Sequence, residues 1–302
     1  MELHLAPLEN VSCWAFRSLC KGATDSYTGM LSLSNLVKRN NAWKEVDTYP
    51  IEGQRQWIQI ATSKEAECAA FLHKLEEELW AFPEKNNVYG IQLNASCPSP
   101  SLIRIGQGPA LIKRVTKVSN LLKELLKGRF KVSIKVRLGL NEFEVKQKKL
   151  VSLFAELEKI DHPNFEGVTV HFKHAQHKSA DAYDYSMIQE LSKFNVPMIV
   201  NGGVNSYADF LKIVSGIETK NIKGFMVGRA AIENPVVIAK MHKDMDGTPF
   251  ALRTPAEMKA EFEALCKVHV PNQSYVEKIR KYCAWARGNE PAGAYTPKGF
   301  YG

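Results

Sequence analysis

The sequence lacks any apolar run approaching 18 residues, so no membrane span is predicted. Its opening segment, MELHLAPLEN, has no basic region followed by a long apolar one, so no signal peptide is predicted either. Six cysteines are present without a CxxC pair, and their spacing fits neither a zinc site nor a small disulfide scaffold. We therefore expect reduced thiols, a cytoplasmic location and no bound metal.

The positive charge is concentrated in one part of the chain. The net charge is +8, and residues 101–150 hold 13 Lys and Arg against three Asp and Glu. Such a segment attracts polyanions such as nucleic acid by counterion release. It is equally typical of a solvated helix face, so charge alone leaves both interpretations open.

Short apolar runs alternate with amphipathic stretches over the first ~240 residues. Eight runs are candidate strands: 3–8, 23–30, 57–61, 88–94, 131–139, 167–172, 197–203 and 224–230. Candidate helices between them include 63–80, 106–127, 142–160, 185–193 and 207–215. Eight β/α units of this length predict an α/β fold, a closed (β/α)8 TIM barrel. A doubly wound sheet that binds a dinucleotide would need a GxGxxG turn after the first strand, and none is present there.

The pattern changes near residue 241, where two further helices are predicted at 255–268 and 274–287 with no strand between them. We therefore predict a barrel domain over residues 1–240 and a small helical domain over 241–302. Its Gly- and Pro-rich end, PAGAYTPKGFYG, is expected to be extended.

Cys97 lies in the stretch around which the chain is organised, IQLNASCPSPS at 91–101. A buried strand is predicted to end there in a loop that carries the thiol. Chemistry in α/β barrels lies at the carboxyl ends of the strands, although an inert half-buried cysteine would give the same local pattern.

The last two predicted strands end in glycines, as Asn201-Gly202-Gly203 and Gly228-Arg229. Loops after strands 7 and 8 commonly bind phosphate in this fold, because glycine lets backbone N–H groups and helix N-termini approach the anion. Arg229 adds a charged fork. Tight turns alone would also explain these glycines.

Further polar residues are predicted at the same mouth: Gln59, Asn94, Lys135, Arg137 and His171. Lys135 and Arg137 share one face of their strand, and a buried lysine requires a negative partner. A bound anionic ring system would satisfy both. His171 alone would be interpreted as a core histidine, but here it is one of five converging polar groups.

These residues, taken in order, resemble the tRNA-dihydrouridine synthases. The resemblance is carried by the opening signature from Leu5 through Ala23 and the cysteine motif Asn94–Pro98, followed by Lys135–Gly139, Val170-His171, Asn201–Gly203 and Gly228-Arg229. It covers about 240 residues, and the helical tail lies where the family has a helical domain.

The resemblance implies a flavin-dependent oxidoreductase that binds FMN, uses NADPH or NADH as reductant and reduces a uridine of tRNA. Cys97 would be the general acid that protonates C5 while hydride reaches C6. The implied cofactor-binding residues are Pro7, Leu8, Gln59, Asn94, Lys135, His171, Asn201, Gly203, Gly228 and Arg229. The implied substrate contacts are Arg104, Arg137 and Lys173, and the basic stretch and helical tail would contact the tRNA backbone.

Several positions depart from the family pattern and indicate a divergent branch. Ser96 precedes the cysteine where the family usually has Gly, Gly29 replaces a common glutamate, and Phe172-Lys173-His174 replaces Gly-Arg-Thr. Two alternatives stay open at this stage. One is a dihydroorotate dehydrogenase-like FMN enzyme acting on a free pyrimidine, towards which Ser96 points. The other is an RNA-binding barrel without catalysis.

Overall fold

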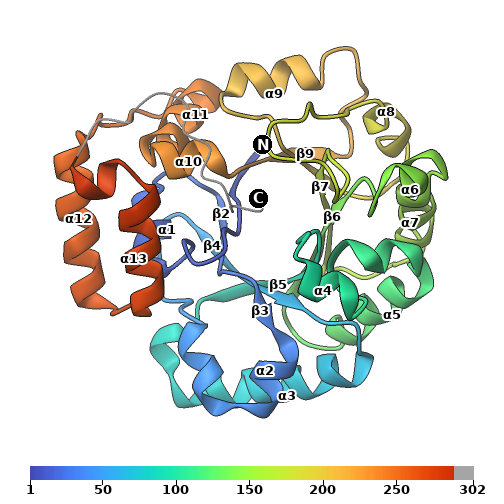
Figure 1. Ribbon diagram of the computed structural model, residues 1–302, viewed down its shortest axis with the longest axis horizontal. Helices are drawn as coiled ribbons and strands as arrows, with labels where there is room; N and C mark the ends of the chain where they lie inside the picture. Colours follow the sequence, from blue (N-terminus) through green and yellow to red (C-terminus); the bar gives the residue numbers. More distant parts are fainter. Residues whose placement is uncertain (289–302) are drawn as a thin grey trace.

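Eight parallel strands close into a barrel in the computed structural model, which describes residues 1–288 (Figure 1). In chain order the barrel strands are β1 (Glu2–Leu5), β2 (Asp25–Tyr27), β4 (Arg55–Ala61), β5 (Val88–Ala95), β6 (Lys131–Arg137), β7 (Phe165–His171), β8 (Met198–Asn201) and β9 (Ile222–Val227). Closure comes from β1, which pairs with β2 on one side and with β9 on the other. The predicted TIM barrel and its eight strands are confirmed. A two-residue strand, β3 (Leu31–Ser32), was not predicted and pairs with the end of β4.

Alternation along each strand separates the barrel interior from the outer core. In β6, Val132, Ile134 and Val136 join the main hydrophobic core under the helices. Ser133, Lys135 and Arg137 alternate with them and are buried on the opposite, interior side. The strand thus delivers two cationic side chains to the inside of the barrel near its carboxyl end.

Helices surround the barrel as a ring (Figure 1). They are α1 (Trp14–Leu19), α2 (Leu33–Lys38), α3 (Glu65–Ala81), α4 (Pro100–Arg104), α5 (Val115–Leu125), α6 (Glu142–Lys146), α7 (Lys149–Leu157), α8 (Ile188–Leu191), α9 (Tyr207–Ile213), α10 (Arg229–Glu233), α11 (Val236–Asp246), α12 (Pro255–Val268) and α13 (Gln273–Tyr282). Short 3-10 turns occupy 40–45, 83–85, 108–113 and 285–287. In the described part of the chain no helix combines the length and apolar character needed to span a membrane.

Four of the predicted helices are shorter or more broken than expected. The helix expected over 274–287 ends at Tyr282, and a separate 3-10 turn follows at 285–287. The helix expected over 106–127 is a 3-10 turn followed by α5, because Gly106 and Gly108 both have left-handed backbone angles. The helix expected over 142–160 is interrupted at Lys148, whose φ of 49° ends α6 and begins α7. The one expected over 185–193 is the single turn of α8.

The C-terminal helices pack against the first helix of the barrel. Phe16 of α1 stacks on Trp285, and the Trp285 indole N–H donates to the Ile232 carbonyl at 2.9 Å. The predicted boundary at residue 240 falls inside α11, and the division into two domains stays a prediction. The Gly- and Pro-rich end, 291–302, lies outside the described residues.

Candidate active site

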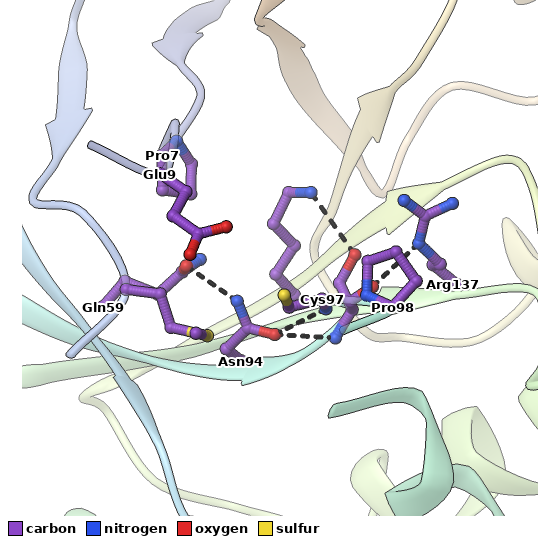
Figure 2. A pocket seen from close by; sticks show the side chains of 10 residues that line it. Pro7, Glu9, Gln59, Asn94, Cys97, Pro98 and Arg137 are labelled. Atoms are coloured by element: carbon purple, nitrogen blue, oxygen red, sulfur yellow. Dashed lines mark hydrogen bonds between the residues drawn. The ribbon is translucent and has the colours of Figure 1, made fainter. Parts of the chain in front are cut away.

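The mouth of the barrel contains an open pocket with about 390 Å³ of empty space, into which Figure 2 looks. Its walls come from the segment after β1, from β4, β5 and β6, and from the loops that follow them. The lining residues are Pro7, Glu9, Met30, Gln59, Asn94, Ser96, Cys97, Pro98, Lys135 and Arg137. Cys97 therefore lies in the same pocket as five of the other residues predicted for the site.

Asn94 fixes the loop that carries the thiol. At the end of β5, its side-chain oxygen accepts hydrogen bonds from the backbone N–H groups of Ser96 and Cys97, at 2.9 and 2.8 Å (Figure 2). Its amide nitrogen donates to the Gln59 side chain at 2.8 Å. These side-chain hydrogen bonds take the place of the β-sheet hydrogen bonds beyond the end of β5, and the chain changes direction there at the mouth of the barrel.

Cys97 is half-buried and forms no disulfide. Burial raises the pKa of its thiol, and the Glu9 carboxylate adds to that effect, while a hydrogen bond from the Ser99 backbone and the charges of Arg137 and Lys135 act in the opposite sense. The net result is a thiol that stays protonated at neutral pH. A protonated thiol is a proton donor, whereas nucleophilic cysteines need a lowered pKa.

Lys135 and Arg137 form a buried cationic pair beside Cys97. Burial, and then the charge of Arg137, lower the pKa of Lys135 to about 7. Burial lowers the pKa of Arg137 to about 10. Ser96 contacts both, because its hydroxyl lies 3.4 Å from the Lys135 ammonium and its carbonyl accepts from Arg137 Nε at 2.8 Å. Two adjacent buried cations favour binding of an anion or of an electron-rich ring.

A layer of amides lies beneath this pair. Gln59 donates to the Gln92 side-chain oxygen at 2.7 Å, and Gln92 lies 3.3 Å from the Ser133 hydroxyl. Both glutamines are buried in the barrel interior. The layer forms a polar floor for the pocket and holds the Gln59 side chain where Asn94 reaches it.

His171 ends β7 next to Asn201 of β8 and Arg137 of β6. Burial, and then the charges of Arg137 and Lys135, hold the pKa of His171 well below its ordinary value, so the imidazole is neutral. Its Nδ1 is buried and has no hydrogen-bond partner among residues 1–288. A buried nitrogen without a partner is costly, so this position suits a ligand that supplies one.

The glycines predicted for phosphate binding lie at the ends of β8 and β9. Gly202 and Gly203 have φ of +102° and +72°, which favour glycine, whereas Gly228 has φ of −121°. A Cβ on Gly228 would meet Ala6 and Leu8 only at ordinary contact distances of 3.4 and 3.7 Å. The protein itself therefore does not require glycine at 228, and its small size leaves room for a ligand.

Asn201 and Arg229 already have partners in the chain. The Asn201 amide donates to the Met226 carbonyl at 2.9 Å and ties β8 to β9. Arg229 donates to the Ser179 hydroxyl at 2.7 Å and to the Tyr183 hydroxyl. Arg229 thus contacts the loop after β7 through Ser179 and Tyr183.

Of the three predicted substrate contacts, only Arg104 on α4 is exposed. Arg137 lines the pocket. Lys173 is buried, and its ammonium donates to the carbonyls of Lys178 and Ser179 at 3.0 and 2.9 Å. The structure thus places Lys173 beneath the loop after β7 rather than on the outer surface.

The basic stretch 101–150 is largely neutralised by ion pairs. Seven of its cations pair with carboxylates: Lys113, Lys117, Lys127, Arg129, Lys131, Lys146 and Lys148. Lys135 and Arg137 lie inside the barrel. The excess charge seen in the sequence therefore does not form one continuous surface.

Four residues that line the pocket were not predicted for the site: Glu9, Met30, Ser96 and Pro98. Ser96 and Pro98 flank the predicted Cys97 in the chain. Glu9 lies two positions after the predicted Pro7, and Figure 2 shows its carboxylate above Gln59. Met30 lies three residues after the end of β2 and is the last residue of the run 23–30 that was predicted as a strand. Glu9 belonged to the opening signature, so its place in that motif was the available signal, whereas Met30 carried none.

A second polar cluster lies at the opposite end of the barrel. Glu2, His4 and Asp25 bring their ligand atoms within 4.8 Å of one another. Arg55 donates to Glu2 at 2.8 Å and to Asp25 at 2.6 Å, which balances the carboxylates. This arrangement is a closed ion-pair network, and the expected absence of a metal stays a prediction.

The family model described as "Dihydrouridine synthase (Dus)" matches residues 4–296. "Probable tRNA-dihydrouridine synthase" of Helicobacter pylori is 25% identical over 299 residues, covering 97% of this chain and 85% of that protein. A protein of the same name from Aquifex aeolicus is 26% identical over 252 residues, covering 81% and 74%. "tRNA-dihydrouridine(47) synthase [NAD(P)(+)]" of Scheffersomyces stipitis is 26% identical over 261 residues, covering 78% and 40%.

Among solved structures, Old Yellow Enzyme from Pichia sp. AKU4542 matches with a TM-score of 0.51 at 9% identity, covering 86% of each chain. This likeness concerns the barrel fold. The family match confirms the resemblance seen in the sequence motifs, and neither a dihydroorotate dehydrogenase nor a barrel without catalysis is favoured by these comparisons.

Proposed function

We propose, from the premise that this chain belongs to the dihydrouridine synthase family, that its barrel mouth binds FMN and that Cys97 is the general acid. The chain is an oxidoreductase that reduces a uridine of tRNA to 5,6-dihydrouridine. The single observation that carries the proposed mechanism is a protonated thiol, Cys97, in one pocket with two buried cations, Lys135 and Arg137.

The residues present fit a flavin mononucleotide in kind. Lys135 and the unpartnered Nδ1 of His171 suit the electron-rich atoms of the ring and chain, and Gly228 with Arg229 suits a phosphate. Pro7 and Leu8 lie at the end of β1, where Pro7 lines the pocket and Leu8 approaches Gly228. When bound and reduced, the flavin supplies the hydride that C6 of the uracil receives.

The protein's own contribution is to position a proton donor. The thiol of Cys97 gives its proton to C5 of the ring, and the S–H bond breaks as the C–H bond forms. Asn94 holds the thiol loop through two backbone N–H groups. The thiolate left behind is stabilised by Lys135 and Arg137, both of which favour the charged form of Cys97.

Because a stacked base cannot reach the bottom of this pocket, the target uridine must turn out of its stack to meet Cys97. Pro98 lines the pocket next to Cys97, and Arg104 is exposed on α4, seven residues after the thiol in the chain, so we propose that they contact the nucleotides next to the target. We further propose that NADPH or NADH reduces the flavin, and that the enzyme works on tRNA in the cytoplasm.

The experiment that tests this function follows the flavin of the purified protein. The protein is reduced anaerobically with NADPH, and its reoxidation is recorded after tRNA that lacks dihydrouridine is added. We expect reoxidation by this tRNA and none by orotate, with dihydrouridine formed in equal amount. Reoxidation by orotate alone would contradict the proposal, as would purified protein that neither retains nor binds flavin.

A further inference from the structure

The loop between β7 and α8, residues 172–187, is folded onto the phosphate end of the site. The backbone N–H of Asp184 donates to the Phe172 carbonyl at 2.9 Å, and the Asp181 carboxylate accepts from the Lys178 N–H at 2.7 Å. The Tyr185 hydroxyl donates to the Gly202 carbonyl at 2.9 Å. The loop is therefore attached to itself and to the glycine turn after β8.

Tyr183 stands at the centre of this loop, and its ring lies directly on the glycine turn. A Cβ on Gly202 would come within 2.4 Å of the Tyr183 ring, and one on Gly203 within 3.0 Å. The Lys173 ammonium lies 4.4 Å from the centre of the same ring. The absence of a side chain at Gly202 is what allows the ring to sit there.

The hydroxyl of Tyr183 is paired with Arg229, which also donates to the Ser179 hydroxyl at 2.7 Å. Since the guanidinium can only donate, the phenol oxygen accepts this hydrogen bond and keeps its own proton for another acceptor. A phenol that accepts from a cation is also a stronger donor.

Four basic side chains act on His171, whose ring lies 5.9 Å from that of Tyr183. The charges that act on the neutral His171 are those of Arg137, Lys135, Lys173 and Arg229, and no carboxylate is among these leading contributions. His171 is buried, and its Nδ1 has no hydrogen-bond partner in the described part of the chain. A buried cluster of cations with an unpartnered polar atom beside it calls for an anion.

We propose that Tyr183 is a binding residue for the terminal phosphate of the flavin, to which its hydroxyl donates while Arg229 holds it. Tyr183 then contributes to the selection of FMN over a flavin without phosphate. This inference rests on the proposed function, because it assigns a further residue to the same cofactor site. It also gives a role to a loop that departs from the family pattern at Phe172–His174.

The test is equilibrium binding of FMN and of riboflavin to the flavin-free protein, measured by the change in flavin fluorescence. Tyr183→Phe removes only the hydroxyl. We expect the Kd for FMN to rise about tenfold, the scale of one hydrogen bond to a charged group, with the Kd for riboflavin unchanged. Tyr89→Phe is the matched control, since Tyr89 also accepts from an arginine, Arg55, but at the opposite end of the barrel. It should change neither constant.

The other outcomes would overturn the inference in distinct ways. An equal rise in the Kd of FMN and of riboflavin would mean that Tyr183 supports the shape of the site and does not bind the phosphate. Tighter binding of FMN by Tyr183→Phe would mean that the phenol competes with the phosphate for Arg229. If the unaltered protein bound neither flavin, the proposed cofactor itself would fail, which is a different result from loss of the phosphate effect alone.

Discussion

The side-chain oxygen of Asn94 accepts a hydrogen bond from the backbone N–H of Cys97 at 2.8 Å, so the next-to-last residue of β5 also sets the position of the thiol. The same oxygen accepts the N–H of Ser96 at 2.9 Å. The three-residue spacing from Asn94 to Cys97 thus reflects a local turn. In this turn one side-chain carboxamide accepts the backbone hydrogen bonds that a neighbouring strand would accept within the sheet.

Asn94→Ala should impair chemistry more than flavin binding. Without the carboxamide, two backbone N–H groups at the mouth lose their acceptor, and the thiol is no longer fixed. We expect the rate of flavin reoxidation by tRNA to fall ~10- to 100-fold, and the free energy of unfolding to fall by ~1–3 kcal/mol. Asn94→Asp keeps the acceptor oxygen and should retain most of the fold stability. An alanine variant with an unchanged rate would contradict this role.

Cys97 should give a characteristic pH profile. Because burial and Glu9 raise the pKa of its thiol, the acid form persists through neutral pH. The single-turnover rate should therefore be flat up to the ordinary thiol pKa of about 8.5 and fall only at higher pH.

Cys97→Ala should retain flavin and lower the single-turnover rate ~100- to 10,000-fold. The rate of this variant should no longer fall at high pH, because the titrating thiol is absent. The profile is measured by stopped-flow absorbance of the flavin on addition of tRNA. An alanine variant that turns over at the normal rate would exclude the thiol as the proton donor.

Lys135 should destabilise the flavin-free protein in a pH-dependent way. Burial lowers its pKa to about 7, so below that pH the folded state holds an unfavourable buried charge, whereas the unfolded state keeps the ordinary pKa. Between about pH 7 and pH 10.5 the unfolded state binds the extra proton, and the stability contributed by this residue rises with pH.

Lys135→Met should consequently raise the free energy of unfolding by ~1–3 kcal/mol at pH 6, with a gain that shrinks towards pH 10. The same variant should bind FMN more weakly. Urea unfolding at several pH values measures the first effect, and flavin fluorescence measures the second. A variant that is less stable than the unaltered protein at pH 6 would refute the assignment.

The sequence was sufficient to predict the barrel and the grouping of Cys97 with five other polar or apolar residues in one pocket, because both depend on short-range patterns. The period-two alternation in β6 predicts that Lys135 and Arg137 share the interior face, and both line the pocket. The breaks at Lys148 and at Gly106 were not predictable from hydrophobic periodicity, since both arise from backbone angles. Tyr183 was missed for a different reason. It reaches the site from an irregular loop, where no repeat relates a residue to the strands.

Arg17 shows how a motif can indicate a family without contributing to its chemistry. It belongs to the opening signature, yet it is fully buried away from the pocket. Its guanidinium donates to the Ser12 carbonyl, to the Asp47 carboxylate at 2.8 Å and to the Gln56 side chain at 3.2 Å. Asp47 in turn accepts the Trp14 N–H at 2.6 Å, at the start of α1.

Arg17→Met should therefore destabilise the fold by ~3–5 kcal/mol, because it leaves Asp47 and two further acceptors unpaired. The flavin affinity of the remaining folded protein should stay the same. Urea unfolding monitored by tryptophan fluorescence gives the first quantity, and titration of the folded fraction gives the second. Loss of flavin binding without loss of stability would place Arg17 in the site instead.

Gly228 and Gly202 should respond differently to the same substitution. Gly228 has φ of −121°, and an added Cβ would meet Ala6 at 3.4 Å, so Gly228→Ala should leave the melting temperature within about 1 °C. Gly202 has φ of +102°, and its Cβ would press on Tyr183 at 2.4 Å, so Gly202→Ala should lower stability by ~1–3 kcal/mol.

Although Gly228→Ala should leave the stability of the fold unchanged, it should weaken the binding of FMN. If the Gly228 backbone lies against the phosphate, the added methyl group of Gly228→Ala would obstruct that contact. The Kd for FMN should then rise ~10-fold, whereas the Kd for riboflavin should stay unchanged. Fluorescence titration with both flavins on the stable variant separates the two effects. Unchanged FMN affinity would show that the space beside Gly228 is not used by the phosphate, and the anion would then have to be held by Arg229 and Tyr183 without the Gly228 backbone.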